Sequence, residues 1–200
     1  ATMALCRADA RRFLIVGSGT QSFWLARSTR LLQPAAVIAI WGRNPDRAAD
    51  VVARLAAVGV MAQVETDLQA GCRAADAILT ATPSPEPLVQ SDWVQPGCHI
   101  TALGADSPGK QELETALVAR ADVRVADMLS QCLDHGEFAT AHAAGLIGEP
   151  DCVQLGAVLS GTSPGRRRPE DITIADLTGV ATQDIAMART VLTRAKGQTA

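Results

Sequence analysis

The sequence predicts an α/β fold built on a doubly wound parallel sheet, followed by a C-terminal amphipathic helix. Three observations support this fold class. Short β-rich runs alternate with longer helical runs over residues 13–135, as in proteins with parallel sheets. A glycine turn, Gly17-Ser18-Gly19, separates the first strand from the first helix. A later turn, rich in serine, proline and glycine, presents Asp106 after another apolar run.

The first half of the chain supplies four expected strands, at 13–16, 37–41, 62–66 and 77–82, each an apolar or β-branched run. Helices are expected between them at 20–32, 45–57 and 68–73. Asn44 before Pro45 marks a helix start, because asparagine caps helices and proline suits the first turn. Pro83 and Pro85 stop the fourth strand, since proline cannot donate to a β-ladder.

The second half continues this alternation and then loosens. A fifth strand at 99–104 leads into the Asp106 loop and a helix at 110–120, centred on 112–119, and a sixth strand follows at 123–126. Further helices are expected at 137–146 and 153–159, with a Gly/Pro/Arg loop at 161–170. A late strand at 172–174 precedes the amphipathic helix at 181–196.

The composition is that of a globular protein of ordinary charge. Of 200 residues, 48% are hydrophobic and 20% are charged, so the chain can bury one substantial core. The net charge is −3, and Arg166-Arg167-Arg168 is its longest run of like charge, which argues against a nucleic-acid partner. No apolar run is long enough to span a membrane, and the N-terminus lacks signal features, so we expect a cytoplasmic protein.

The cysteines and histidines form no metal-binding pattern. The five cysteines are widely spaced without a C-x-x-C pair, so we expect reduced cysteines and no metal. His99 lies within an apolar strand, where a hydrogen-bonded core histidine is commoner than a catalytic base. No Ser-His-Asp set and no pair of acids is evident, and Glu137 has no partner acid.

The glycine turn predicts a dinucleotide site. Gly17 permits a tight turn, Gly19 lets the backbone approach a pyrophosphate, and the helix N-terminus supplies free N–H groups. Ser22, in place of a third glycine, is small enough for the helix to pack closely on the strand. The alternative is a plain turn, but the position between strand and helix favours nucleotide binding.

The end of the second strand indicates which dinucleotide is bound. NAD-binding proteins commonly place an acid there to hold the ribose 2′-hydroxyl, whereas this chain has Gly42-Arg43-Asn44. Arg43 can pair with a 2′-phosphate, so we expect NADP(H) to be preferred, with NAD(H) as the second choice. The alternative is a surface arginine without a ligand.

Three strand ends are candidates for the rest of the site. Asp106 lies where open α/β sheets collect ligands and is the candidate acid, with a helix cap as the alternative. The Thr82-Pro83-Ser84 segment, after the fourth strand, either lines the cofactor or merely ends the strand. Asp176-Leu177-Thr178-Gly179 ends the late strand similarly, and Gly179 allows close approach of a ligand.

Five motifs, in order, resemble the ornithine cyclodeaminase/μ-crystallin family: G-S-G-T-Q, W-G-R-N-P-D-R-A, A-T-P-S-P-E-P, G-A-D-S-P-G-K-x-E-L and I-T-I-A-D-L-T-G. The resemblance implies an NAD(P)-binding Rossmann domain over residues 1–180 and a closing helix over 181–200. It also implies that the family's preceding domain, which grips the substrate carboxylate, lies outside this chain and receives that helix. A protein containing both parts is expected to be a homodimer.

The resemblance assigns roles to individual residues. Asp106 matches the catalytic acid, and Asp106, Ser107 and Gly179 match residues that face the substrate. The implied cofactor contacts are Gly17, Ser18, Gly19, Thr20, Gln21, Arg43, Asn44, Thr82, Pro83, Thr101, Ala102, Leu103, Ser107 and Thr178.

The function implied by the resemblance is NAD(P)H-dependent reduction of a cyclic imino acid such as Δ1-pyrroline-2-carboxylate. Two alternatives stay open: an ornithine cyclodeaminase, which forms proline and ammonia with the help of NAD, and a catalytically silent NADPH-binding fragment or small-ligand-binding module. Arg43 and the segment D-L-T-G-V-A-T-Q-D favour the reductase. In either reaction a carboxylate beside the imine carbon performs acid–base work.

Overall fold

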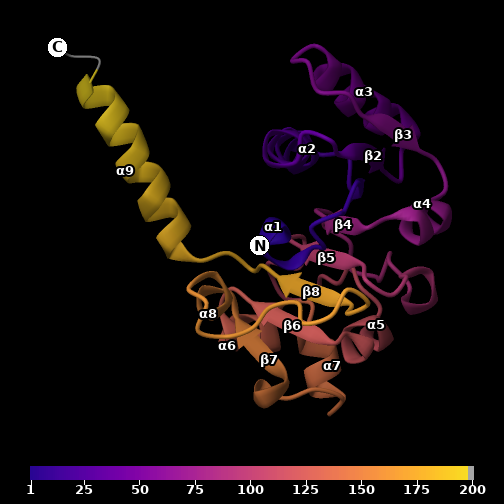
Figure 1. Ribbon diagram of the computed structural model, residues 1–200, viewed down its shortest axis with the longest axis vertical. Coiled ribbons are helices and arrows are strands. Elements are labelled where there is room, and N and C mark those ends of the chain that lie inside the picture. Colours follow the sequence, from indigo (N-terminus) through magenta and orange to yellow (C-terminus); the bar gives the residue numbers. More distant parts are fainter. Residues whose placement is uncertain (198–200) are drawn as a thin grey trace.

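The computed structural model describes residues 1–197, which contain one sheet of eight parallel strands (Figure 1). The strand order is β3-β2-β1-β4-β5-β8-β6-β7. Because this order reverses direction between β1 and β4, the predicted doubly wound sheet is confirmed. The strands are β1 (Arg12–Val16), β2 (Val37–Trp41), β3 (Gln63–Glu65), β4 (Ala77–Thr80), β5 (His99–Ala102), β6 (Val123–Ala126), β7 (Cys152–Gln154) and β8 (Thr173–Asp176).

Helices cover both faces of the first half of the sheet. The side chains of Phe13 and Ile15 in β1 pack with α2 (Thr20–Leu32) and α3 (Pro45–Ala56). The alternate residues Leu14 and Val16 face the opposite cluster, which includes Cys72 of α4 (Leu68–Ala74). This two-sided burial explains why β1 is a continuous apolar run rather than an alternating one.

The second half of the sheet is completed by the last strand. β8 lies between β5 and β6, with Asp176 opposite both Ala102 and Ala126. The helices α5 (Thr115–Arg120), α6 (Leu129–Asp134) and α7 (Ala139–Ala143) contribute to the same core cluster as α4. On the other face, α1 (Thr2–Leu5) and α8 (Leu155–Leu159) pack over β6 and β8. Two short 3-10 turns, η1 (Ser91–Trp93) and η2 (Glu149–Asp151), complete the connections.

Three predicted helices are wrong in their bounds. The helix expected at 110–120 begins only at Thr115, because Leu113 instead forms a parallel bridge with Val89. The helix expected at 153–159 begins at Leu155, since the preceding residues form the edge strand β7. The helix expected at 137–146 is shorter in the structure, where it corresponds to α7. In addition, the sequence pattern did not predict α6. Short apolar runs of this length fit a strand or a helix equally well.

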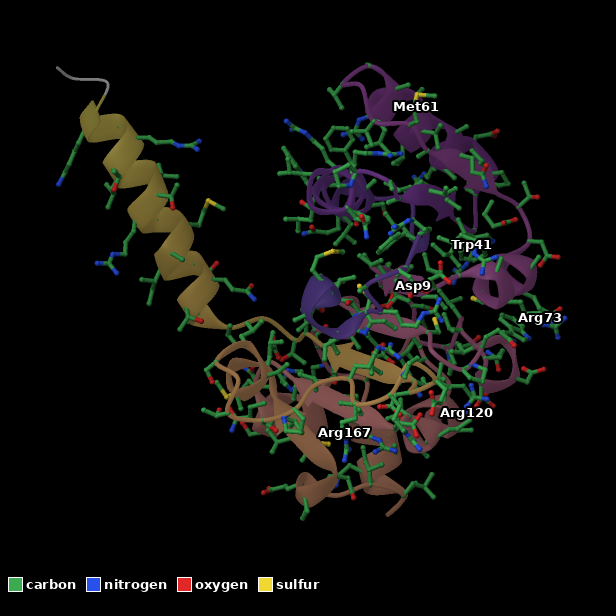
Figure 2. All side chains as sticks on the ribbon, viewed as in Figure 1. Asp9, Trp41, Met61, Arg73, Arg120 and Arg167 are labelled. Atoms are coloured by element: carbon green, nitrogen blue, oxygen red, sulfur yellow. The ribbon has the colours of Figure 1, made fainter. Side chains whose placement is uncertain are left out.

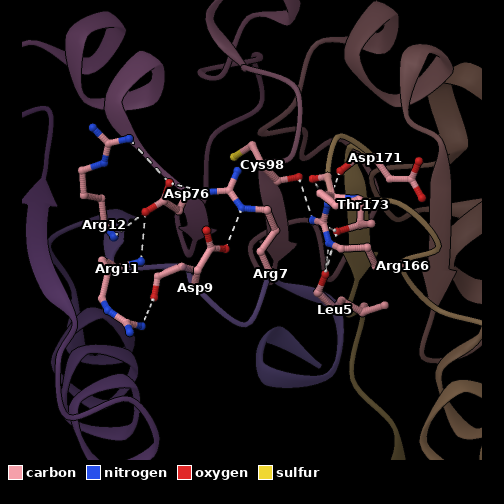
Figure 3. A network of polar contacts seen from close by, with 12 residues as sticks. Leu5, Arg7, Asp9, Arg11, Arg12, Asp76, Cys98, Arg166, Asp171 and Thr173 are labelled. Atoms are coloured by element: carbon pink, nitrogen blue, oxygen red, sulfur yellow. Dashed lines mark hydrogen bonds and ion pairs between the residues drawn. The ribbon is translucent and has the colours of Figure 1, made fainter.

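A network of polar contacts ties the N-terminal segment to the sheet (Figure 3). Asp76, immediately before β4, accepts hydrogen bonds of 2.9 Å from the backbone N–H groups of residues 11 and 12 and one of 3.0 Å from Arg7. Arg166 donates to the carbonyl oxygen of Leu5 at 2.9 Å and to Thr173 Oγ1 at 3.1 Å. Because its members are far apart in the chain, the network fixes α1 against β8.

The helix α9 (Ala181–Gly197) extends away from the rest of the described chain (Figures 1 and 2). None of its residues is buried, and the apolar side chains of Ile185, Met187, Val191 and Leu192 are each more than half exposed. Residues 198–200, the end of the predicted closing helix, lie outside the described part. No helix within residues 1–197 is both long enough and apolar enough to cross a membrane.

Candidate functional site

A cavity of about 540 Å³ opens beyond the carboxyl ends of β1, β2 and β4. This is the point where the strand order reverses, which is the usual ligand position in a doubly wound sheet. The volume is in the range of small-ligand sites. The lining residues are Gly17, Ser18, Gly19, Trp41, Gly42, Arg43, Asn44, Arg47, Ala81, Thr82, Pro83, Ser84, Pro85 and Leu88.

The turn between β1 and α2 has the features that a phosphate group needs. Gly17 adopts a φ of +133°, and a Cβ there would lie 2.7 Å from the Ala81 carbonyl oxygen, so only glycine fits. At Gly19, no atom lies within 4 Å of where a Cβ would be, so a ligand can approach the backbone closely. The helix α2 has no side-chain cap, which leaves the N–H groups of its first turn, including exposed Thr20 and Gln21, available to an anion.

Small residues hold this turn close to its neighbours. Ser22 of α2 is fully buried, and its Oγ would lie 3.3 Å from a Cβ on Gly17. At the end of β2, a Cβ on Gly42 would lie 2.6 Å from Ser18 Oγ. The two glycines therefore allow the loops after β1, β2 and β4 to meet around one cavity.

Two arginines give the cavity a positive charge. Arg43 and Arg47 are exposed and line it, and no Asp or Glu belongs to the described lining. The side-chain oxygen of Asn44 caps α3 by accepting from Asp46 N at 2.9 Å. This cap uses the side-chain oxygen of Asn44, so its side-chain amide nitrogen can make the predicted cofactor contact.

Asp106 lies in the exposed loop after β5, next to the cavity-lining loop after β4. Lys110 Nζ donates to its Oδ1 at 2.6 Å, and Ser107 Oγ donates to the same oxygen at 3.2 Å. The hydrogen bond from Lys110 holds the pKa of Asp106 below its usual value, so the carboxyl group is ionised at neutral pH. The alternative interpretation as a helix cap is wrong, because α5 begins at Thr115 with Glu114 as its cap residue.

The predicted contacts on β5 lie mostly inside the protein. Thr101 and Ala102 are buried, and Leu103 is half-buried just beyond the strand. Thr101 Oγ1 is 2.8 Å from His99 Nε2 and 2.7 Å from Thr2 Oγ1, so this hydroxyl already has protein partners. Burial lowers the pKa of His99 to about 3, which agrees with a neutral core histidine.

The loop after β8 is held by an acid from a neighbouring strand. Asp127, which follows β6, accepts from Thr178 Oγ1 at 3.0 Å and from Gly179 N at 2.8 Å. Gly179 has a φ of +94°, which other residues rarely adopt. Because β8 pairs with β5, Thr178 and Gly179 share a sheet edge with Asp106. They do not line the 540 Å³ cavity, nor do Thr20, Gln21, Thr101, Ala102, Leu103, Asp106 and Ser107.

Sequence reasoning named Asp176 and Glu137 without predicting their burial beneath this edge, and it gave no role to Glu112, which is also buried. The carboxylate of Glu137 accepts from the backbone N–H groups of Glu112 and Leu113, and burial, with the charges of Glu112 and Asp176 added, raises its pKa well above the usual value. Burial also raises the pKa of Asp176 to about 7. One sequence signal was available in Gly136, where a Cβ would lie 2.4 Å from Asp176 Oδ2. Within residues 1–197, no cluster of His, Cys, Asp and Glu has an arrangement suited to a metal ion.

A dinucleotide suits the residues around the cavity. Free N–H groups at the start of α2 and an approachable glycine backbone suit a pyrophosphate, and the two arginines suit further negative charge. The fold and this edge of the sheet together define a protein of the Rossmann-type dinucleotide-binding class.

Comparison with known proteins places the chain more narrowly. Residues 1–199 match the model of the ornithine cyclodeaminase/mu-crystallin family, and the chain belongs to this family.

Several curated relatives are similar in sequence. An iminosuccinate reductase of Paracoccus denitrificans is 38% identical over 183 residues, which cover 91% of this chain and 56% of the relative. An alanine dehydrogenase of Archaeoglobus fulgidus is 35% identical over 188 residues, covering 94% of this chain and 58% of the relative. A Δ1-pyrroline-2-carboxylate reductase of Paracoccus denitrificans is 33% identical, and an ornithine cyclodeaminase of Agrobacterium fabrum is 28% identical.

Two solved structures share the fold closely. An archaeal alanine dehydrogenase dimer with bound NAD has a TM-score of 0.92 at 34% identity, covering 100% of this chain and 62% of that one. The iminosuccinate reductase of Paracoccus denitrificans in complex with NAD+ has a TM-score of 0.90 at 36% identity, covering 99% and 61%. The chain thus spans less than two thirds of the length of these proteins.

Proposed function

We propose that the protein containing this chain uses NAD(P)H to reduce the C=N bond of a 2-imino carboxylate. The observation that carries this proposal is the position of Asp106, an ionised carboxylate one strand beyond the nucleotide cavity and at the same edge of the sheet. Relatives whose names specify iminosuccinate and Δ1-pyrroline-2-carboxylate as substrates support this substrate class. Cyclic imino acids are our first choice within it.

The proposed division of labour assigns binding to the cavity and acid–base chemistry to the Asp106 loop. When bound, the reduced nicotinamide supplies the hydride. The carboxylate of Asp106 would stabilise the positive charge of a protonated imine and exchange a proton with its nitrogen. Lys110 favours the ionised form of Asp106 through their 2.6 Å hydrogen bond, and Ser107 orients the same oxygen. Thr178 and Gly179 would close the opposite side of the substrate position.

An activity assay on the protein encoded by the complete reading frame tests this proposal. NADPH and NADH are supplied with Δ1-pyrroline-2-carboxylate, or with a 2-oxo acid and ammonia, and absorbance of the reduced cofactor is followed. Oxidation of the cofactor that depends on imine supports the reductase. Conversion of ornithine to proline and ammonia without net cofactor oxidation would instead support the cyclodeaminase, to which the 28% identical relative belongs by name. Quenching of protein fluorescence by NADPH without any turnover would support the silent binding module.

We propose a cofactor preference for NADP(H), which is supported by Arg43 and Arg47 in a cavity whose described lining residues include no acid. The two comparison structures contain NAD, whereas we propose that this chain prefers NADP(H). We expect Arg43→Asp to weaken NADPH binding by about 10- to 100-fold relative to NADH, because a charge-assisted contact to phosphate becomes repulsion. Fluorescence titration with both cofactors measures this ratio.

A matched control makes the same change of charge away from the cavity. Arg54 of α3 lies 4.8 Å from the Phe23 ring centre and does not belong to the cavity lining. Arg54→Asp should leave the NADPH-to-NADH ratio unchanged. Equal binding of both cofactors by the unmodified protein would contradict the NADP(H) preference.

We also propose that α9 packs on a further domain of the complete protein, which would form a homodimer. The support is the exposure of four apolar side chains, Ile185, Met187, Val191 and Leu192, on a helix without buried residues. The archaeal relative with 34% identity is described as a dimer. In the complete protein, slow amide hydrogen exchange along α9 is expected, whereas fast exchange there would exclude such packing.

A further inference from the structure

Glu112 is a fully buried acid that touches two strand-end loops at once. Its Oε1 accepts from Thr82 N at 2.6 Å and from Thr82 Oγ1 at 2.7 Å, in the loop after β4. Its Oε2 accepts from Gly104 N at 2.8 Å, in the loop after β5, and from Thr80 Oγ1 at 2.5 Å. Each carboxylate oxygen therefore has two donors, and the two loops are joined through one side chain.

The chain around Glu112 is shaped to bring this carboxylate to the loops. A Cβ on Gly104 would lie 2.4 Å from Glu112 Cδ and 2.1 Å from the Thr82 carbonyl oxygen, so the close approach requires glycine. Leu88 N and Val89 N both donate to the carbonyl oxygen of Glu112, at 2.8 and 3.0 Å. This extended segment is the part that the sequence pattern had assigned to a helix.

A second buried acid fixes the backbone of Glu112. Glu137 Oε1 accepts from Glu112 N at 2.7 Å, and Glu137 Oε2 accepts from Leu113 N at 2.9 Å. Two buried acids in succession, Glu137 in the turn before α7 and then Glu112, thus connect this turn to the sheet edge. Burying a charged group raises the free energy of the folded state unless hydrogen bonds compensate for the lost water. These two acids therefore need a role that explains their burial.

We propose that Glu112 is a positioning residue, whose carboxylate sets the cofactor-lining loop at Thr82 and the acid loop at Asp106 in one fixed relation. The role of Asp106 in this proposal rests on the proposed function. The connection of the two loops through Glu112 does not, because it follows from the hydrogen bonds to Thr82 and Gly104. Asp106 follows Gly104 by two residues, so a shift of Gly104 moves the acid. A misplacement of about 1 Å can cost about 100-fold in rate.

The four donors favour a carboxylate over an amide at position 112. Two of them are backbone N–H groups, at Thr82 and Gly104, and these cannot turn away or act as acceptors. In Glu112→Gln the new NH₂ group would face one of these N–H groups, and that loop would have to move.

The experiment compares Glu112→Gln with the unmodified protein in the complete chain. For the variant we expect about 100-fold lower kcat per folded molecule. We also expect the dissociation constant of NADPH to rise about tenfold, because loss of one well-placed contact to the Thr82 loop corresponds to about that change. Amide hydrogen exchange at residues 82 and 104 should become faster in the absence of any ligand.

Glu114→Gln is the matched control. Glu114 lies two residues further along, is half-buried, and accepts from Ser91 N at 2.7 Å rather than from a strand-end loop. The Glu114→Gln variant should change the thermal stability of the protein without changing kcat or the affinity for the cofactor. If Glu112→Gln behaves in this same way, the residue is only structural and the positioning role is wrong.

A milder variant keeps the test decisive if Glu112→Gln does not fold. Thr80→Val removes a single donor to Glu112 and leaves both loops chemically unchanged. We expect kcat to fall several-fold and amide hydrogen exchange at residue 104 to become measurably faster. If neither quantity changes, the proposal is overturned.

If the unmodified protein reduces no imino acid, the proposed function fails. The amide exchange rates at residues 82 and 104 then still decide whether Glu112 holds the two loops.

Discussion

Replacing Asp106 with asparagine is expected to lower imino-acid turnover by about 10²- to 10⁴-fold, the usual contribution of a positioned acid–base group. Asparagine keeps the size of the side chain but removes its negative charge and its ability to exchange a proton. Because Asp106 does not line the nucleotide cavity, the dissociation constant of NADPH should change by less than about twofold. Steady-state kinetics and fluorescence titration of the complete protein measure both quantities.

The control for this variant is Asp92→Asn, at an exposed aspartate of η1. It should retain the turnover of the unmodified protein. Wild-type turnover in Asp106→Asn would remove Asp106 from the chemistry, whereas a parallel loss of turnover and cofactor binding would point to a disturbed loop.

Asp176→Asn is expected to remove much of the pH dependence of stability near neutrality. In the folded protein, burial raises the pKa of Asp176 to about 7 from a usual value of 3.8. Below pH 3.8 both the folded and the unfolded chain hold the proton, and the stabilising effect of the higher folded pKa is fully present. As the pH rises through 7, this contribution is lost, and between pH 5 and 8 the loss is about 2–3 kcal/mol.

Asparagine resembles the protonated form of Asp176 and does not titrate. The free energy of unfolding of Asp176→Asn, measured with urea at pH 5 and pH 8, should therefore fall less than that of the unmodified protein. Asp50→Asn, at an exposed position on α3, should keep the full decline. An unchanged decline in Asp176→Asn would assign the pH dependence to Glu112 and Glu137, whose pKa values burial also raises.

The nucleotide half of the fold could be predicted because its signals are local. Gly17 at the end of β1 and the Asn44 cap of α3 depend on neighbouring residues, and both lie where the sequence pattern expected them. The predicted bounds of helices were wrong where contacts with residues distant in the sequence determine the structure. Residues 110–114 are extended because Val89 and Glu137 bind them, and no local pattern contains these contacts.

The candidate site was predicted unevenly for the same reason. Residues that follow strands, such as Arg43, Thr82 and Asp106, could be named as candidates from their positions in the sequence. The acids that hold the loops could not, because Glu112 is on a segment with helical periodicity and Asp127 resembles an ordinary turn residue. What distinguishes them is hydrogen bonding across the sheet edge, between residues as far apart as Asp127 and Gly179.

The place of β8 between β5 and β6 also bears on how this chain reaches its native state during synthesis. When β5 and β6 have left the ribosome, the strand that joins them has not yet been made. Until Thr173–Asp176 emerges, β5 presents an unpaired strand edge, which invites pairing with other chains. Closing such long-range contacts is slow, so the nascent chain passes through a period in which this edge of β5 is open to pairing with other chains.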